Sequence, residues 1–394
     1  MASYNPNDPA LQADPFAAYQ WLRDEQPLYR NDKLGFWAIS RHADVATAWR
    51  DNATFSSDHG PALEQWGPDA AQTMGFVALD PPLHTLRRRQ ISQGFTPSRV
   101  RRLEPRIREL TRAYLHPLLE HGSFDFVDFA TAIPVDVISE LIGVPPQDRS
   151  LLRRLSQQIM TRDDLDGHLT SAVKEANAEL AGYYASLLTE RRRHPHEDLI
   201  TSLLHADVDG ERLADRDVIA TLMLLGVAGN ETTTKLISTA WRCAWQHPDQ
   251  RERVWSGDID AGAWVEETLR YEGPSQYTAR RLTRPVELHG ITVPADACIL
   301  LVIAAANRDE RAFPDAGRYD MTRDTSRTLA FGLGQHFCLG ASLARLEATI
   351  VLQELMKTVE ADYDVDVASA SWAASPNVRG HAHLPTMVKR RRTT

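Results

Sequence analysis

Apolar residues recur at helical spacing over much of the chain. Leu103, Ile107, Leu110 and Tyr114 follow one another at intervals of three or four residues, as the buried face of a helix requires. This pattern predicts strongly helical structure over 97–203. Similar spacing predicts a helix that begins after Asp14-Pro15, and helices over 43–49, 264–271 and 341–359.

The longest predicted helix covers 216–245, and Asp215 could cap its first turn. It is apolar over its first part, as a buried helix is, but polar residues lie in its middle at 230–233. Buried polar groups cost free energy unless they are paired or used. The segment is therefore either an ordinary kink, in which threonine hydroxyls bond carbonyls one turn back, or a functional site.

Shorter alternating runs predict strands. A hairpin is expected over 28–39, with further strands over 286–288, 291–293 and 298–303 and short strands in the tail 372–389. The segment 56–80 is rich in Gly, Pro and Asp and lacks periodicity, which is often a sign of function in a compact chain. Since no linker or repeat interrupts the pattern, we expect one domain, 1–394, mainly α with a smaller β region.

Composition excludes several classes of protein. The formal net charge of -9 argues against a nucleic-acid binder, and short basic runs such as 87–89 are expected to be solvated faces. The longest apolar run, 218–229, is shorter than the ~20 residues of a membrane span. The first residues lack the features of a signal peptide, so we expect a cytoplasmic protein without membrane insertion.

The three cysteines, Cys243, Cys298 and Cys338, are widely spaced, which argues against a disulfide framework and a zinc site. Glycines surround Cys338 directly before the predicted helix 341–359, and glycine allows tight turns and close approach of a flat ligand. Unpaired N–H groups at a helix start lower the pKa of a thiol. Such a thiolate could ligate a metal or act as a nucleophile; the alternative is a buried free cysteine in a glycine-rich turn.

This segment resembles the haem-binding loop of the cytochrome P450 family. The family's pattern F-x-x-G-x-x-x-C-x-G is met by Phe331, Gly334, Cys338 and Gly340. The resemblance implies the cytochrome P450 fold, with haem b sandwiched between the long central helix and the cysteine loop. Cys338 would ligate the haem iron, Phe331 would pack against the ligand loop, and Cys243 and Cys298 would be core residues.

Two further motifs match the same family. Glu267 and Arg270 form an E-x-x-R pair on one helix face, which in the family is a buried structural lock joined by a later arginine, here Arg318 or Arg323. The polar segment of the long helix matches the family's acid–alcohol pair. The resemblance implies that Ala228 and Gly229 border the haem, and that Glu231 and Thr232 pass protons to dioxygen as general acid catalysts.

Cationic residues match the family's contacts to the two haem propionates. The segment 80–88 resembles D-P-P-E-H-T-R-L-R, although Leu83 departs from the pattern and Leu86-Arg87 is reversed. His84 and Arg88 then lie one turn apart and suit carboxylates, with Arg87 or Arg89 as substitutes for Arg88. Arg280 and His336 are the other propionate partners that the resemblance implies.

Substrate contacts are also implied by family position. They are Leu224, Val227, Ala228, Gln276, Tyr277, Thr278, Asn377 and Val378. Several of these positions are apolar, and Gln276, Tyr277, Thr278 and Asn377 could orient a polar group. The resemblance implies a small lipophilic substrate, such as one of the steroid, terpenoid, fatty acid or polyketide class. The segments 66–68 and 161–170 are expected to form a lid.

The implied reaction combines R–H with dioxygen, two electrons and two protons to give R–OH and water. Variants are epoxidation, oxidative coupling and decarboxylation; other classes are a haem-thiolate sensor without turnover and a cysteine hydrolase using His336 as base. Three cysteines cannot hold a four-cysteine cluster, so electrons come from outside. The expected partners are a ferredoxin and an NAD(P)H-dependent ferredoxin reductase, docking on cations such as Arg87, Arg89, Arg102 and Arg345.

Overall fold

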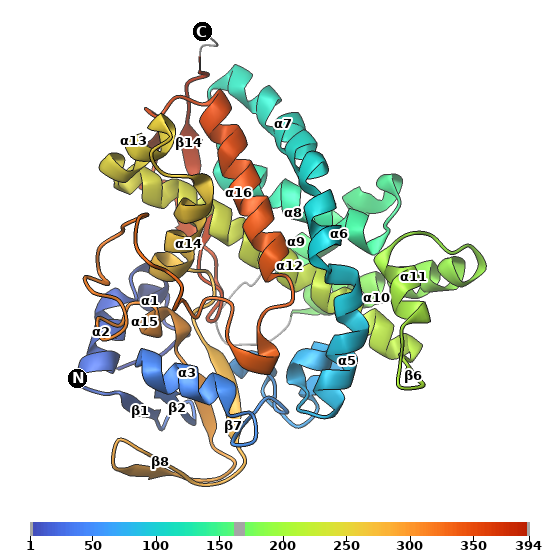
Figure 1. The fold of residues 1–394 in the computed structure, drawn as a ribbon, viewed down its shortest axis with the longest axis vertical. Helices are drawn as coiled ribbons and strands as arrows, with labels where there is room; N and C mark the ends of the chain where they lie inside the picture. Colours follow the sequence, from blue (N-terminus) through green and yellow to red (C-terminus); the bar gives the residue numbers. More distant parts are fainter. Residues whose placement is uncertain (1–2, 161–169, 392–394) are drawn as a thin grey trace.

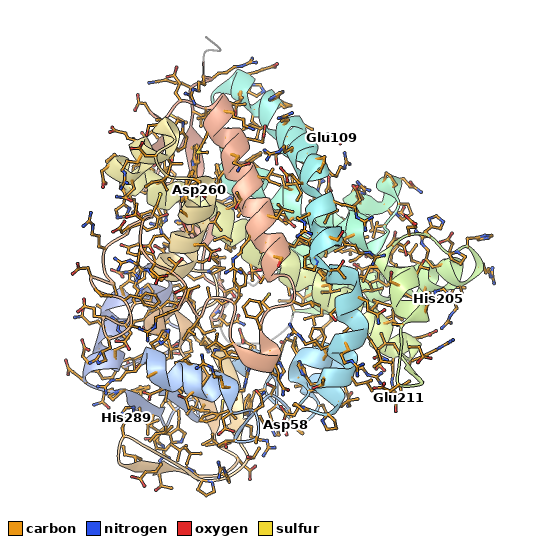
Figure 2. All side chains as sticks on the ribbon, viewed as in Figure 1. Asp58, Glu109, His205, Glu211, Asp260 and His289 are labelled. Carbon is orange, nitrogen blue, oxygen red and sulfur yellow. The ribbon has the colours of Figure 1, made fainter. Side chains whose placement is uncertain are left out.

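The computed structural model describes residues 3–160 and 170–391, and it is rich in helix with several small sheets, as predicted. In Figure 1 the strands of the largest sheet lie beside the N-terminal helices, and the longer helices fill most of the rest of the molecule. Exposed charged side chains, among them Glu109, His205, Glu211 and His289, project from its outer surface (Figure 2).

Helices occupy most of the segment predicted to be helical and the C-terminal half. The early helices are α1 (Pro9–Ala13), α2 (Phe16–Asp24), α3 (His42–Arg50), α4 (Ala70–Met74), α5 (Leu83–Ser92), α6 (Pro97–Arg102), α7 (Glu104–His121), α8 (Phe126–Ile142) and α9 (Arg149–Met160). The later helices are α10 (Ser171–Arg193), α11 (Leu199–His205), α12 (Asp215–Gln246), α13 (Pro248–Ser256), α14 (Ala261–Glu272), α15 (Ile303–Ala306) and α16 (Ala341–Thr358).

The long helix α12 is the centre of the fold and packs against α8, α10, α14 and α16 (Figure 1). Its second half is fully buried around Trp241, whose side chain is 0% exposed. The predicted cap is wrong: Ala214 is the N-cap residue, and Asp215 is the first helical residue. The Asp215 carboxylate instead accepts a hydrogen bond of 2.8 Å from Arg192 on α10, and its charge still favours the helix start.

The largest sheet has the strand order β1-β2-β10-β7-β3. Its strands are β1 (Leu28–Asn31), β2 (Phe36–Ile39), β3 (Phe55–Ser56), β7 (Thr278–Leu282) and β10 (Cys298–Leu301). The predicted hairpin is confirmed by the pairing of Leu28 with Ile39, while β10 runs parallel to β2 and antiparallel to β7. The parallel pair joins segments about 260 residues apart in the chain, which local patterns cannot predict.

Smaller sheets complete the β region. They consist of β4 (Ser123–Asp125), β11 (Asp364–Val365) and β14 (Pro385–Met387); β5 (Asp207–Val208) and β6 (Glu211–Arg212); β8 (Val286–Leu288) and β9 (Ile291–Val293); and β12 (Ser371–Trp372) and β13 (His381–His383). The segment 56–80, expected to be irregular, contains α4 and the short turns Leu63–Gln65 and Gly75–Ala78. No helix in the described ranges has both the length and the apolar character needed to cross a bilayer.

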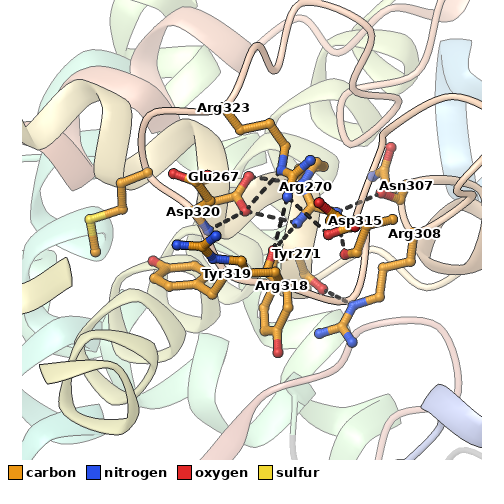
Figure 3. A network of polar contacts seen from close by, with 12 residues as sticks. Glu267, Arg270, Tyr271, Asn307, Arg308, Asp315, Arg318, Tyr319, Asp320 and Arg323 are labelled. Atoms are coloured by element: carbon orange, nitrogen blue, oxygen red, sulfur yellow. Dashed lines mark hydrogen bonds and ion pairs between the residues drawn. The ribbon is translucent and has the colours of Figure 1, made fainter. Parts of the chain in front are cut away.

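The E-x-x-R pair forms the predicted buried lock (Figure 3). Both side chains are 0% exposed, and Arg270 donates two hydrogen bonds of 2.8 Å to Glu267. Arg270 also donates to the carbonyls of Asn307, Ala316 and Arg318. The third arginine is Arg323, whose Nε lies 3.5 Å from the Glu267 carboxylate. This network holds the 307–323 segment against α14, and the chain then enters the cysteine loop.

Loss of one partner from this lock should destabilise the whole protein. Glu267→Gln leaves the buried Arg270 guanidinium without its counter-charge, which costs about 3–5 kcal/mol in the free energy of unfolding. Denaturant unfolding followed by circular dichroism measures the loss. Arg154→Ala is the control, since the Arg154–Glu179 pair is half exposed and its loss costs less than about 1 kcal/mol. Equal effects of the two variants would contradict the role of the lock.

Candidate active site

A cavity of about 350 Å³ lies between α12, the cysteine loop and the start of α16. Its lining is mostly apolar and includes Leu224, Leu225, Phe76, Ile138 and Leu343. Cys338 from the loop and Thr232 from α12 line the same cavity. The fold therefore brings the cysteine loop and the polar segment of α12 together at one cavity.

Glycine backbone holds the cysteine loop close to α3. Gly332 and Gly334 have positive φ angles of 69° and 67°. A Cβ on Gly332 would lie 2.9 Å from the Trp49 ring, and one on Gly334 would lie 3.1 Å from the Trp49 carbonyl oxygen. The Cys338 N–H donates to the Phe331 carbonyl at 2.9 Å, which closes the loop. The two glycines are thus required both by backbone conformation and by space.

The Cys338 side chain is open to the cavity that it lines. Burial raises the pKa of its thiol, and the N–H groups of Gly340 and Ala341 together with Arg88 and Arg345 offset only part of this effect. The expectation of a lowered thiol pKa is therefore wrong for the protein alone. The helix start acts in the predicted direction, but the loss of water around the sulfur outweighs it.

The polar segment of α12 forms part of a continuous helix. Thr232 lines the cavity, and its hydroxyl donates to the Ala228 carbonyl at 2.8 Å, the bond of an ordinary helical threonine. Ala228 and Gly229 also line the cavity, and a Cβ on Gly229 would meet nothing within 4 Å. Glu231 is not among the lining residues, because it lies on a neighbouring face of the helix.

Two of the four predicted propionate partners, Arg88 and His336, line the cavity, while His84 and Arg280 are not among its lining residues and lie beside residues that are. Arg88 donates to the Phe337 carbonyl at 2.6 Å. The rings of His84 and His336 are 4.0 Å apart between centroids. The Arg280 guanidinium lies over the Trp49 ring at 4.6 Å. Both ring nitrogens of His84 and the Nε of Arg280 are buried and have no hydrogen-bond partner within residues 3–160 and 170–391.

This cluster has an excess of positive charge. Burial and the neighbouring Arg88 and Arg280 lower the pKa of His84 to about 4, although Asp80 opposes the change. Burial also lowers the pKa of Arg280 to about 10. Buried donors without acceptors indicate that an anionic ligand completes the site. Haem fits this site, since it brings two carboxylates to the cations and a metal to the sulfur of Cys338.

Six of the eight predicted substrate positions line the cavity: Leu224, Ala228, Tyr277, Thr278, Asn377 and Val378. Val227 lies outside the lining. Gln276 does too, because its side chain accepts a hydrogen bond of 2.8 Å from Tyr19 and donates one of 2.9 Å to the Gly273 carbonyl. A buried amide with these partners cannot orient a substrate.

The predicted substitutes for Arg88 and the first predicted lid segment do not match the lining of the cavity. Arg87 pairs with Asp217 and Arg89 with Asp209, so neither replaces Arg88. The segment 66–68 does not line the cavity, and 161–169 lies outside the described residues. Sequence reasoning missed Glu347, a cavity residue of α16. Its signal was a carboxylate one turn after Leu343, on the apolar stripe of the helix.

Removal of the buried Arg280 charge should weaken haem binding. Arg280→Gln loses a charge-assisted hydrogen bond worth about 1.5–3 kcal/mol, so haem affinity should fall roughly tenfold to a hundredfold. Haem titration of the cofactor-free protein measures this. Arg284→Gln is the control, because Arg284 is exposed and its guanidinium bonds Thr54, whereas Arg280 is buried. Unchanged affinity in Arg280→Gln would contradict the assignment.

Comparisons with known proteins agree with this geometry. The sequence model of the family Cytochrome P450 matches residues 262–369. A Mycobacterium tuberculosis protein named cytochrome P450 123 is 43% identical over 391 residues, covering 98% of this chain and 97% of that protein. The erythromycin C-12 hydroxylase of Saccharopolyspora erythraea is 38% identical over 87% of both chains. The structure of cytochrome P450 CYP109Q5 from Chondromyces apiculatus matches with a TM-score of 0.90 at 34% identity, over 99% of each chain. The chain therefore belongs to the cytochrome P450 family of monooxygenases.

Proposed function

We propose that this monooxygenase hydroxylates a neutral lipophilic substrate in the cavity between α12 and the cysteine loop. The observation that carries the proposal is the placement of Cys338 and Thr232 on the same apolar cavity, one from the loop and one from the central helix. The sulfur can hold a haem iron, and the hydroxyl can deliver protons within a space that excludes water.

The cationic edge of the cavity would orient the haem. Arg88, Arg280, His84 and His336 would hold the two propionates, since their donors lie at one edge and lack anionic partners. Bound haem with a thiolate ligand supplies the activation of dioxygen and the cleavage of its O–O bond. The protein contributes orientation of the cofactor, exclusion of water and the supply of protons.

Thr232 and Glu231 would supply those protons. The Thr232 hydroxyl now donates to the Ala228 carbonyl, so it must turn about its Cα–Cβ bond before it can donate into the cavity. Glu231 lies one helical turn before the buried Lys235, and its charge favours the protonated form of that lysine. Lys235 itself donates to the His381 carbonyl at 2.5 Å. We infer that Glu231 takes protons from the solvent side and passes them to Thr232.

The lining favours an uncharged substrate. Of the Arg, Lys, Asp and Glu side chains among the described lining residues, Arg88 belongs to the propionate edge, and Glu347 is an acid that would not attract a carboxylate. A fatty acid carboxylate would therefore find no cation beside the substrate positions. The named activity of the erythromycin C-12 hydroxylase supports a large lipophilic molecule as substrate and hydroxylation as the reaction. Steroids, terpenoids and polyketides fit better than fatty acids.

Electrons would come from a ferredoxin, which a ferredoxin reductase reduces with NAD(P)H. Three of the four cations proposed for docking already pair with a carboxylate. Arg87 is only 19% exposed and pairs with Asp217, while Arg345 pairs with Glu266 and lies over the Phe331 ring. Arg89 pairs with Asp209 but is 60% exposed, and Arg102 is exposed, so these two are the better candidates for contact with an acidic ferredoxin.

Replacement of Thr232 tests the proposed proton supply. Thr232→Ala should keep NAD(P)H consumption but lower the product formed per NAD(P)H about tenfold to a hundredfold, because general acid catalysis contributes ~100-fold or more. The two quantities are measured together in a reconstituted electron-transfer assay. Thr221→Ala is the control, since the Thr221 hydroxyl makes the same bond to a carbonyl of α12 but does not line the cavity. Full coupling in Thr232→Ala would refute the assigned role.

Substrate charge can be tested without turnover. Pools of neutral macrolides, steroids and terpenoids should change the haem optical spectrum at lower concentration than fatty acids of equal length, by at least about tenfold, because burial of an unpaired carboxylate is costly. Methyl esters of the same fatty acids are the matched control. Tighter binding of the free acids than of their esters would contradict a neutral substrate.

A further inference from the structure

Glu347 is a carboxyl group in the cavity that the proposed reaction does not use. It lies on α16, the helix that follows the cysteine loop (Figure 1). Its position is one turn after the lining residues Leu343 and Ala344. The residue is 3% exposed, and its Oε2 atom is buried without a hydrogen-bond partner among the described residues. No cation in the same part of the chain lies beside it to stabilise a carboxylate.

The charged groups on the elements around α16 are mostly engaged with other partners. Arg108 and Arg112 of α7 pair with Glu354, and Glu266 and Glu267 of α14 pair with Arg345 and Arg270. Lys235 of α12 interacts with Glu231 and with the His381 carbonyl. On α6, Arg99 bonds Ser202, while Arg101 and Arg102 are exposed. Cys338, Arg88 and His336 face the same cavity. Burial raises the pKa of Glu347 to about 8, and no charged group in the described part of the chain offsets the effect.

A second glutamate on the same helix shows the contrast. Glu354 is 1% exposed, but Arg108, Arg112 and Lys357 lie 2.7–2.9 Å from its carboxylate. Burial alone would raise the pKa of Glu354, yet hydrogen bonds from these three cations lower it to about 2. The fold thus supplies cations around one buried carboxylate of α16 and none around Glu347, which is therefore an uncharged acid at neutral pH.

The negative charge of an electron added within the cavity acts electrostatically on the Glu347 carboxyl group. Negative charge in a region of low dielectric raises the proton affinity of a nearby carboxyl, and by linkage the proton favours uptake of the electron. We propose that Glu347 is a proton-binding site linked to the electron that bound haem accepts, a proposal that rests on the proposed function. When Glu347 is ionised, it binds one solvent proton as one electron from the external donor reduces iron(III) to iron(II), so that carboxylate and proton give the neutral acid.

The direction of the effect follows from linkage. Below the pKa of Glu347, the acid is neutral in both oxidation states, and the equilibrium constant for reduction does not depend on pH. Above it, the carboxylate opposes the electron, so that constant falls by up to tenfold for each unit rise in pH. Glu347 in its neutral form thus keeps the cofactor easy to reduce at neutral pH.

The test is an equilibrium redox titration of the haem-loaded protein between about pH 6 and about pH 10. The wild-type midpoint potential should be constant at low pH and fall at high pH. Glu347→Gln, which is neutral at every pH, should match the wild type at low pH and stay constant throughout. Glu354→Gln is the matched control on the same helix, and it should retain the wild-type fall, because Glu354 is ionised over the whole range.

A second measurement needs no variant. Redox-triggered infrared difference spectra of the wild type at high pH, with isotope-labelled glutamate, should show the carbonyl stretch of a protonated carboxyl group appearing on reduction. A wild-type potential that is independent of pH, a fall that persists in Glu347→Gln, or the absence of that band would overturn the proposal. Failure to take up haem would instead refute the proposed function.

Discussion

Buried positive charge without a matching anion is the constraint on which this site depends. Two arginines and two histidines lie at or beside the edge of the cavity, and the Nε of Arg280 and the ring nitrogens of His84 have no partner in the described part of the chain. Each unsatisfied buried donor costs about 1–3 kcal/mol, so the fold accepts this cost only where a ligand removes it. Burial likewise raises the pKa of the Cys338 thiol, and a bound metal cation would favour its thiolate form. The cations at the edge and the Cys338 thiol, which shares the cavity with the central helix, together fit an anionic ligand that carries a metal.

The rest of the structure keeps these groups in place. The Glu267–Arg270 lock fixes the segment before the cysteine loop through backbone carbonyls rather than through direct contact with the cavity. Trp49 of α3 restricts the position of the loop, because two glycines of the loop pack directly against it. The central helix lines the cavity, with open space beside Gly229 and a hydroxyl group at Thr232. Rigid elements on both sides allow precise placement of reacting groups.

Sequence patterns predicted the local structure well and the side-chain environments less well. The hairpin and the long helix follow from periodicity, and the glycine-rich loop follows from the spacing around Cys338. The Asp215 cap was wrong, because a tertiary ion pair with Arg192 uses its carboxylate. Gln276 was wrong as a substrate contact, since Tyr19, 257 residues away in the chain, binds its amide. Glu347 was missed because only the folded structure shows that a helical carboxylate has no cation beside it.

The central claim is the bond between the sulfur of Cys338 and a haem iron. The most direct measurement is the optical spectrum of the reduced, haem-loaded protein under carbon monoxide, for the wild type and for Cys338→Ser. The account predicts the red-shifted Soret band of a thiolate ligand in the wild type and its loss in the variant. A wild-type band at the position of a neutral axial ligand, or a red-shifted band that survives in Cys338→Ser, would contradict it.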